Sequence, residues 1–209
     1  TLTSGTPVTT SDVTGATSIY YTPYVSNVIT LWDGYRWRPI EFSEYTLALG
    51  TLTSGKPYDV FAYLSSGALA CEMLAWTNDT TRATAITIQD GRYCKSGDKT
   101  RLYLGTFYTT SSTTTEDSVS KRYVWNAYNR VEKFMSVVDT TNTWTYTTAA
   151  WRSANNSTAN RVNFVRGLDI EPVAVTVVGI AANTVASAVG AVGVGIDSTT
   201  ANSAQVMGS

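Results

Sequence analysis

The sequence predicts an all-β protein, an antiparallel β-sandwich of jelly-roll-like type. Short runs rich in Tyr, Phe, Trp, Val and Thr recur along the chain, and several of them alternate between two faces. Turn signals such as Asp-Gly separate these runs at intervals of roughly eight to twelve residues. About a dozen short strands in this pattern are typical of sandwiches and barrels. No linker divides the chain, so we expect a single domain over residues 1–209.

The first expected element is a β-hairpin, which follows a polar, turn-rich lead-in at residues 1–18. Asp33-Gly34 separates two aromatic runs, and Asp-Gly between such runs is a strong hairpin signal. We place the two strands at Val28–Trp32 and Arg36–Phe42. Pro39 has no backbone N–H to donate, so the second strand should lie at a sheet edge.

The middle of the chain predicts three more strands, at Tyr58–Leu64, Ala68–Trp76 and Thr84–Gln89. Residues 68–75 also contain good helix formers, so a short helix is the alternative there. A second Asp-Gly pair, Asp90-Gly91, predicts another hairpin directly after the third strand.

The densest aromatic and β-branched content lies between Thr100 and Val131. Its first half alternates, which is typical of a strand with two packed faces. One face is expected to carry Leu102, Leu104, Thr106 and Tyr108, and the other Tyr103, Gly105, Phe107 and Thr109. Residues 121–131 fit a helical spacing, but their Tyr, Trp and Val content favours a strand. We therefore expect a long hairpin or a pair of strands crossing the sheet.

The last third of the chain predicts strands at Phe134–Asp139, Trp144–Thr148 and Val162–Val165, with another beginning at Trp151. Beyond them, residues 173–209 form a segment rich in Val, Gly and Ala. We expect two strands joined near residues 181–184, which complete the sheet or pair with a neighbouring subunit.

Residues 173–196 carry no charge and are long enough to span a membrane. However, Asn183, Thr184 and Ser187 interrupt this stretch, and Gly and Val dominate where Leu is usual in membrane helices. Membrane insertion is therefore not expected.

Composition excludes several classes of function. The 15 Lys and Arg balance 16 Asp and Glu, so there is no basic surplus to favour a nucleic-acid partner. The chain has 0 histidines, which excludes a Ser–His–Asp triad within it. Zinc needs His or several Cys, and Cys71 and Cys94 are the only cysteines, so no metal or other cofactor is expected. These two cysteines either form a disulfide or remain as two small buried side chains.

A family resemblance covers nearly the whole chain, on phrases that occur in order. They include LWDGYRW, YDVFAY, LAWTNDTTRATAI, DGRYCKSGDKTRLYLGTF, TEDSVSKRYVWNAYNRV, TNTWTYTTAAWR and GIDSTTANSA. Together they resemble a β-rich domain that recurs in tailed-phage virion proteins, often near the end of long fibre, spike or minor tail chains. One phrase departs from the family pattern, which has an Arg pair before Tyr-Leu-Gly where this chain has Arg101-Leu102.

The resemblance implies a non-enzymatic structural protein on the surface of a virion. It implies a homotrimer, with other virion proteins as partners and adhesion to a host-surface glycan or particle reinforcement as the task. The family pattern carries no catalytic motif that can be transferred to this sequence.

The residues around the first Asp-Gly turn are the candidate glycan site. Aromatic faces stack on sugar rings, and nearby charged groups hydrogen-bond sugar hydroxyls. The candidate residues are Trp32, Asp33, Tyr35, Arg36 and Trp37. The alternative is ordinary cross-strand aromatic packing beside a turn. A free-standing carbohydrate-binding module is a rival class that would use the same residues.

A polysaccharide depolymerase is the enzymatic alternative, because a glycosidase requires two facing carboxyl groups. The candidates are Glu116, Asp117, Asp169 and Glu171, with Glu41, Glu44 and Asp59 further away. The competing interpretation is that these are solvated carboxylates in turns.

Two further clusters have a functional and a structural interpretation. The cations Arg122, Arg130 and Lys133 near Trp125 predict either an anion site or internal cation–π pairing. The aromatic residues Trp144, Tyr146 and Trp151 are expected to pack within the sheet.

Overall fold

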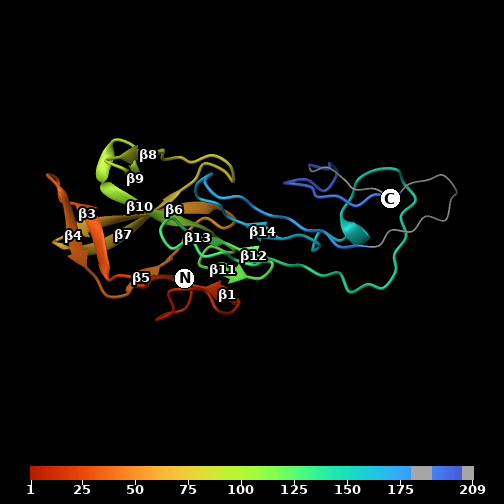
Figure 1. The fold of residues 1–209 in the computed structure, drawn as a ribbon, viewed down its shortest axis with the longest axis horizontal. Helices are drawn as coiled ribbons and strands as arrows, with labels where there is room; N and C mark the ends of the chain where they lie inside the picture. Colours follow the sequence, from red (N-terminus) through yellow and green to blue (C-terminus); the bar gives the residue numbers. More distant parts are fainter. Residues whose placement is uncertain (180–189, 204–209) are drawn as a thin grey trace. The chain divides into compact units, whose positions relative to one another are not determined.

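The computed structural model describes residues 1–179 and 190–203. This part of the chain contains fourteen strands and one short 3-10 turn, Ala154–Asn156, and no α-helix. The predicted all-β, antiparallel fold is confirmed, and its several sheets are compatible with a β-sandwich (Figure 1). None of the described residues forms a helix able to cross a membrane.

The chain divides into two compact units. The first unit consists of Thr1–Ser136 and Val162–Asp169, and the second of Val137–Arg161 and Ile170–Ser209. All fourteen strands lie in the first unit.

A six-stranded sheet is the largest element of the first unit. Its strands are β6 (Pro57–Ser65), β7 (Ala68–Ala75), β8 (Ile86–Gln89), β9 (Arg92–Lys95), β10 (Asp98–Tyr108) and β13 (Val124–Asn126). The order is β7-β6-β10-β9-β8, and β13 also pairs with β10. Both segments for which a helix was an alternative, 68–75 and 121–131, supply strands instead.

The remaining strands form three smaller sheets. The pairs are β2 (Ser18–Tyr21) with β5 (Tyr45–Ala48) and β3 (Val28–Trp32) with β4 (Trp37–Glu41). The last sheet orders β1 (Val13–Ala16), β11 (Thr115–Ser118), β12 (Lys121–Arg122) and β14 (Asn163–Phe164). The predicted first hairpin is confirmed, with Trp32 opposite Trp37, and Pro39 lies on a strand whose one neighbour is β3.

The predicted alternation of β10 is correct as far as Leu104 and wrong after it. Leu102 pairs with Ala62, Tyr103 with Phe61 and Gly105 with Val60, so one extra residue is inserted in β10. This irregularity is a β-bulge, which shifts the following side chains to the opposite faces. Phe107 consequently packs in the same core as Leu102 and Leu104. Thr106 instead hydrogen-bonds Tyr103 across 2.5 Å.

The six-stranded sheet has a core on each face. The larger core joins Val60, Leu104 and Phe107 to Leu31 of β3 and Leu47 of β5. The smaller core, on the other face, is formed by the buried residues Phe61, Tyr103 and Ala127. The hairpin strands are therefore anchored to β6 and β10 by apolar burial, the main driving force for folding.

The chain from residue 134 onward corrects several expectations. No strand forms at Phe134–Asp139, at Trp144–Thr148 or from Trp151. The two predicted C-terminal strands are also absent from the described residues 173–179 and 190–196. The join expected at 181–184 lies outside the described residues. These segments have β-favouring residues, but a strand also needs a partner backbone to accept and donate hydrogen bonds. Val162–Val165 finds that partner in β12, and its centre becomes β14.

Candidate binding site at the hairpin ends

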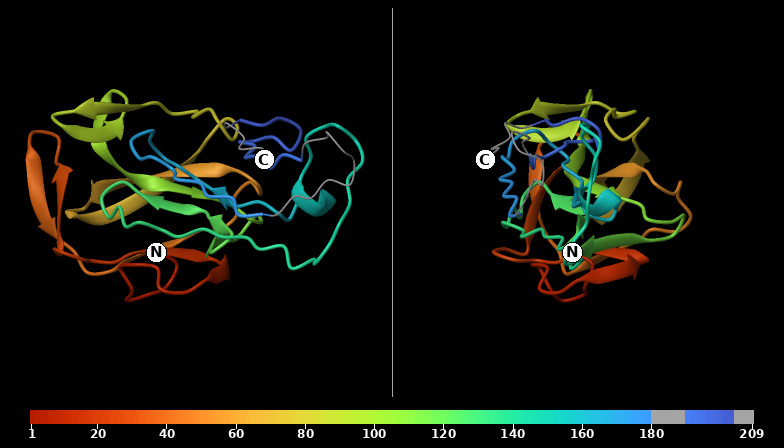
Figure 2. Two further views of the ribbon diagram at one scale, coloured as in Figure 1. Left: turned by 45° about the vertical axis from the view of Figure 1, so that its right-hand side comes forward. Right: turned by 90° about the vertical axis from the view of Figure 1, so that its right-hand side faces the viewer.

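Two hairpins meet at one end of the first unit, where β3–β4 lies beside β8–β9 (Figures 1 and 2). In the first turn, the Asp33 carboxylate accepts hydrogen bonds of 2.9 Å from the backbone N–H groups of Arg36 and Tyr35. These two bonds lower the pKa of Asp33. Asp33 thus shapes the turn, as its Asx-type bonding predicts.

The two tryptophans of the first hairpin form the centre of this site. The Trp32 and Trp37 rings lie edge to face with centroids 5.5 Å apart. The guanidinium of Arg92 lies 4.7 Å from the centroid of Trp37, and the ammonium of Lys99 lies 4.8 Å from that of Trp32. Each ring therefore carries a cation over a face, an electrostatically favourable arrangement.

Asp90, from the second Asp-Gly turn, connects the two hairpins. Its Oδ2 accepts hydrogen bonds from Trp37 Nε1 at 3.1 Å and from Lys99 Nζ at 2.7 Å. Hydrogen bonds from Lys99, first, and from Trp37 lower the pKa of the Asp90 carboxyl group. At the tip of the first hairpin, the side chains of Tyr35 and Arg36 remain exposed, at 92% for Tyr35 and 79% for Arg36.

The structure thus brings together two of the five predicted residues, Trp32 and Trp37, while Asp33 supports the turn and two side chains project outward. The sequence analysis did not assign Asp90, Arg92 and Lys99 to this site. The second Asp-Gly pair was the sequence signal for the turn that contains Asp90. Only the packing of β3–β4 against β8–β9 brings that turn to the tryptophans. Aromatic faces combined with charged hydrogen-bonding groups are the components of a saccharide site.

The structure does not make a facing pair of Glu116 and Asp117. They are consecutive on β11, so their side chains point to opposite faces. Glu116 accepts hydrogen bonds from the Ser118 hydroxyl at 2.7 Å and from Lys121 Nζ at 3.1 Å. Both carboxylates are buried rather than solvated in a turn.

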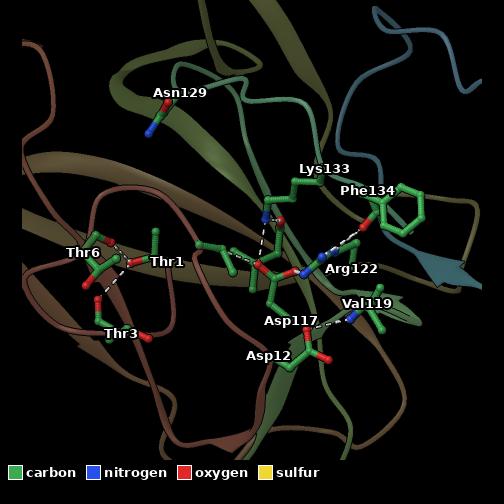
Figure 3. A network of polar contacts seen from close by, with 12 residues as sticks. Thr1, Thr3, Thr6, Asp12, Asp117, Val119, Arg122, Asn129, Lys133 and Phe134 are labelled. Atoms are coloured by element: carbon green, nitrogen blue, oxygen red, sulfur yellow. Dashed lines mark hydrogen bonds and ion pairs between the residues drawn. The ribbon is translucent and has the colours of Figure 1, made fainter. Parts of the chain in front are cut away.

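Asp117 is the centre of a buried network (Figure 3). Its side chain is 0% exposed and accepts from Lys133 Nζ at 2.7 Å and from the Thr9 hydroxyl at 2.8 Å. Arg122 pairs with it at 3.4 Å and also donates to the Phe134 carbonyl. Two of the three cations proposed for an anion site are therefore bound to this carboxylate.

Three of the other candidate carboxylates, Asp169, Glu44 and Asp59, are also engaged within the protein. Asp169 pairs with Arg166 at 2.7 Å. Glu44 accepts from the Ser4 and Thr22 hydroxyls and the Gly5 N–H. Asp59 is buried against Arg82, with Asp59 Oδ2 2.7 Å from Arg82 Nε. No group of three or more His, Cys, Asp or Glu suited to a metal ion occurs in residues 1–179 or 190–203.

The second aromatic cluster surrounds a cation instead of packing in a sheet. The Arg152 guanidinium lies 3.6 Å from the Tyr146 ring centroid and 5.7 Å from that of Trp144. Trp151 is 38% exposed. Cys71 and Cys94 are free thiols, which resolves the alternative in favour of unbridged cysteines.

Comparisons of the chain with protein-family models, with curated proteins and with solved structures find no match. The fold and the site define an all-β protein with an aromatic and charged surface at its hairpin ends.

Proposed function

We propose that this protein is a non-enzymatic structural component of a tailed-phage virion, a fibre, spike or capsid-decoration domain. It assembles as a homotrimer on the particle surface and serves in adhesion or reinforcement. The resemblance of the sequence phrases supports the virion assignment. The observation that carries the assembly is the composition and exposure of the second unit.

The described part of the second unit contains no buried core. None of its described residues is buried, over 137–161, 170–179 and 190–203. Val138, Val178 and Ile196 are 75%, 93% and 66% exposed. Its charged residues are Asp139, Arg152, Arg161, Glu171 and Asp197.

A segment of this kind is not stabilised by its own contacts, because it buries too little apolar surface to offset the entropy of ordering the chain. Exposed apolar side chains with few charges between them are typical of a surface covered by another chain. In the proposed homotrimer, the other two copies of the chain cover this surface.

The assembly is tested by the solution mass of the full chain, measured by multi-angle light scattering. We expect a trimer, and we expect Val178→Asp to shift it toward monomer because a buried carboxylate in an apolar interface is costly. The matched control is Val25→Asp, since Val25 is 91% exposed but lies in the first unit. A monomeric native chain, or equal effects of the two substitutions, contradicts the proposal.

Adhesion through the hairpin ends is supported by the Trp32, Trp37 and Asp90 arrangement. The test is binding of the full protein to purified surface polysaccharide of a host strain. Trp32→Ala removes the ring next to Lys99, and we expect binding to fall at least fivefold. Release of reducing ends from the same polysaccharide would favour the depolymerase instead, and unchanged binding by Trp32→Ala removes the adhesion role of this site.

A further inference from the structure

A groove lies in the first unit, and none of the residues that line it belongs to the hairpin ends. It is an open groove of about 510 Å³ between two loops. Its walls are Thr53, Ser54, Gly55 and Lys56 on one side and Thr77, Asn78, Asp79 and Thr80 on the other. The volume falls within the range of small-molecule sites, roughly 300–1,000 Å³.

Several side chains that line the groove make no intramolecular hydrogen bond within the described part of the chain. In the described chain, neither the Lys56 ammonium nor the Asp79 carboxylate makes an ion pair or a side-chain hydrogen bond, although most carboxylates discussed above do. The hydroxyls of Thr53, Ser54 and Thr77 also make no hydrogen bond to another described residue. Their hydrogen-bonding capacity is therefore available to a ligand.

Buried hydrogen bonds hold the first wall in place. The Thr109 hydroxyl, on a residue that is 0% exposed, donates to the Thr53 carbonyl at 2.7 Å and accepts from the Lys56 N–H at 2.9 Å. The Gly55 N–H donates to the Thr109 carbonyl at 3.0 Å. The Tyr58 hydroxyl accepts from the Thr53 N–H at 2.8 Å. This wall is thus preorganised, which lowers the entropy cost of binding.

The second wall is held by its own turn. The Thr77 N–H donates to the Thr81 carbonyl at 2.8 Å, and the Asn78 side-chain oxygen accepts from the Thr80 N–H and hydroxyl. Tyr108 lies by the groove, since a Cβ on Gly55 would be 3.7 Å from its hydroxyl. The ring of Tyr123 lies beside it, with centroids 4.9 Å apart.

We propose that this groove binds a neutral saccharide unit. Sugar hydroxyls both donate and accept, and the groove offers an acceptor at the Asp79 carboxylate, a cationic donor at Lys56, and hydroxyls that do both. Charged groups form the stronger hydrogen bonds to neutral partners. The Tyr108 hydroxyl, beside Gly55, is a further polar group at the edge of the groove.

The charge balance of the groove determines the class of saccharide. One cation and one carboxylate line it, so its net charge is zero and it gives no preference for phosphate or for acidic sugars. This site is separate from the hairpin ends and does not rest on the adhesion role proposed for them.

The test uses saturation-transfer NMR on the full-length protein with methyl glycosides of glucose, galactose, mannose and rhamnose. We expect at least one neutral glycoside to bind, and its affinity to fall at least fivefold in Asp79→Asn and in Lys56→Gln. The matched controls are Asp169→Asn and Lys95→Gln, which change the same residue types outside the groove.

The proposal is overturned if none of the four glycosides shows saturation transfer, or if Asp79→Asn binds the glycoside as tightly as the native protein. Tighter binding of methyl glucuronide or inorganic phosphate than of the neutral glycoside also overturns it. Binding that is lost in Trp37→Ala but kept in the groove variants also overturns it, and supports the hairpin ends as the saccharide site.

Discussion

Asp59 and Arg82 form an ion pair that the first unit keeps largely away from water. The Asp59 side chain is 1% exposed and also accepts from the Thr106 hydroxyl at 2.6 Å. The Arg82 guanidinium donates to the Gly167 carbonyl and lies 4.2 Å from the Trp76 ring centroid. Every charge is compensated, which is the condition under which a buried pair is tolerated.

Removing the cation should therefore be costly. Arg82→Ala leaves the Asp59 charge buried, and we expect the free energy of unfolding to fall by about 3–5 kcal/mol, measured by urea denaturation. The control is Arg36→Ala, because Arg36 is 79% exposed and 3.9 Å from Asp33. That variant should lose about 0–1 kcal/mol. Equal losses in the two variants would show that burial does not determine the cost.

The two thiols should be inert in the folded protein. Burial raises the pKa of Cys71 to about 12 and that of Cys94 to about 11. Because the thiolate is the reactive form, we expect slow reaction with a disulfide reagent at pH 8 and fast reaction of both thiols in denaturant. Reagent absorbance with time measures this. Rapid labelling of the native protein contradicts it, and Cys71→Ser and Cys94→Ser identify which thiol reacts.

At the scale of elements, the bulge in β10 decides how the two cores are filled. Gly105 lies at the bulge, where β13 comes close to β10. A Cβ at this position would overlap the Trp125 carbonyl oxygen. A side chain here forces the strands apart, since packed interiors absorb added atoms poorly.

Gly105→Ala should consequently destabilise the protein by about 1–3 kcal/mol. Thermal unfolding of the native and variant proteins measures the effect. Gly179→Ala is the control, because a Cβ there meets nothing within 4 Å. An unchanged midpoint for Gly105→Ala would mean that β13 moves away at no cost.

For the whole molecule, the contrast between the two units determines how a protease attacks it. The second unit contains Arg152 and Arg161 and has no buried residue in its described part. Cleavage requires a locally open chain, so these sites should be cut first in dilute monomer. Because assembly covers the unit, we expect trypsin cleavage there to slow as protein concentration rises. Mass spectrometry of the fragments over time measures the cleavage rate. Cleavage independent of concentration contradicts protection by assembly.

Local signals in the sequence were sufficient for much of the first unit. Asp33-Gly34 and Asp90-Gly91 predicted two hairpins, both confirmed, because turn chemistry acts over four residues and needs no distant partner. Alternation over residues 102–109 also predicted a strand, which forms as β10 (Asp98–Tyr108), although its faces change at the bulge. Of the candidate site, the sequence located the tryptophans.

Only the tertiary structure decided which distant groups meet. Asp90 reaches Trp37 because β3–β4 packs beside β8–β9, and the Asp117 carboxylate meets Lys133 and Arg122 across segments with no common motif. Local β propensity was equally strong at residues 144–148, yet no strand forms there. Propensity belongs to a residue, whereas a strand exists only when a second backbone completes its hydrogen bonds.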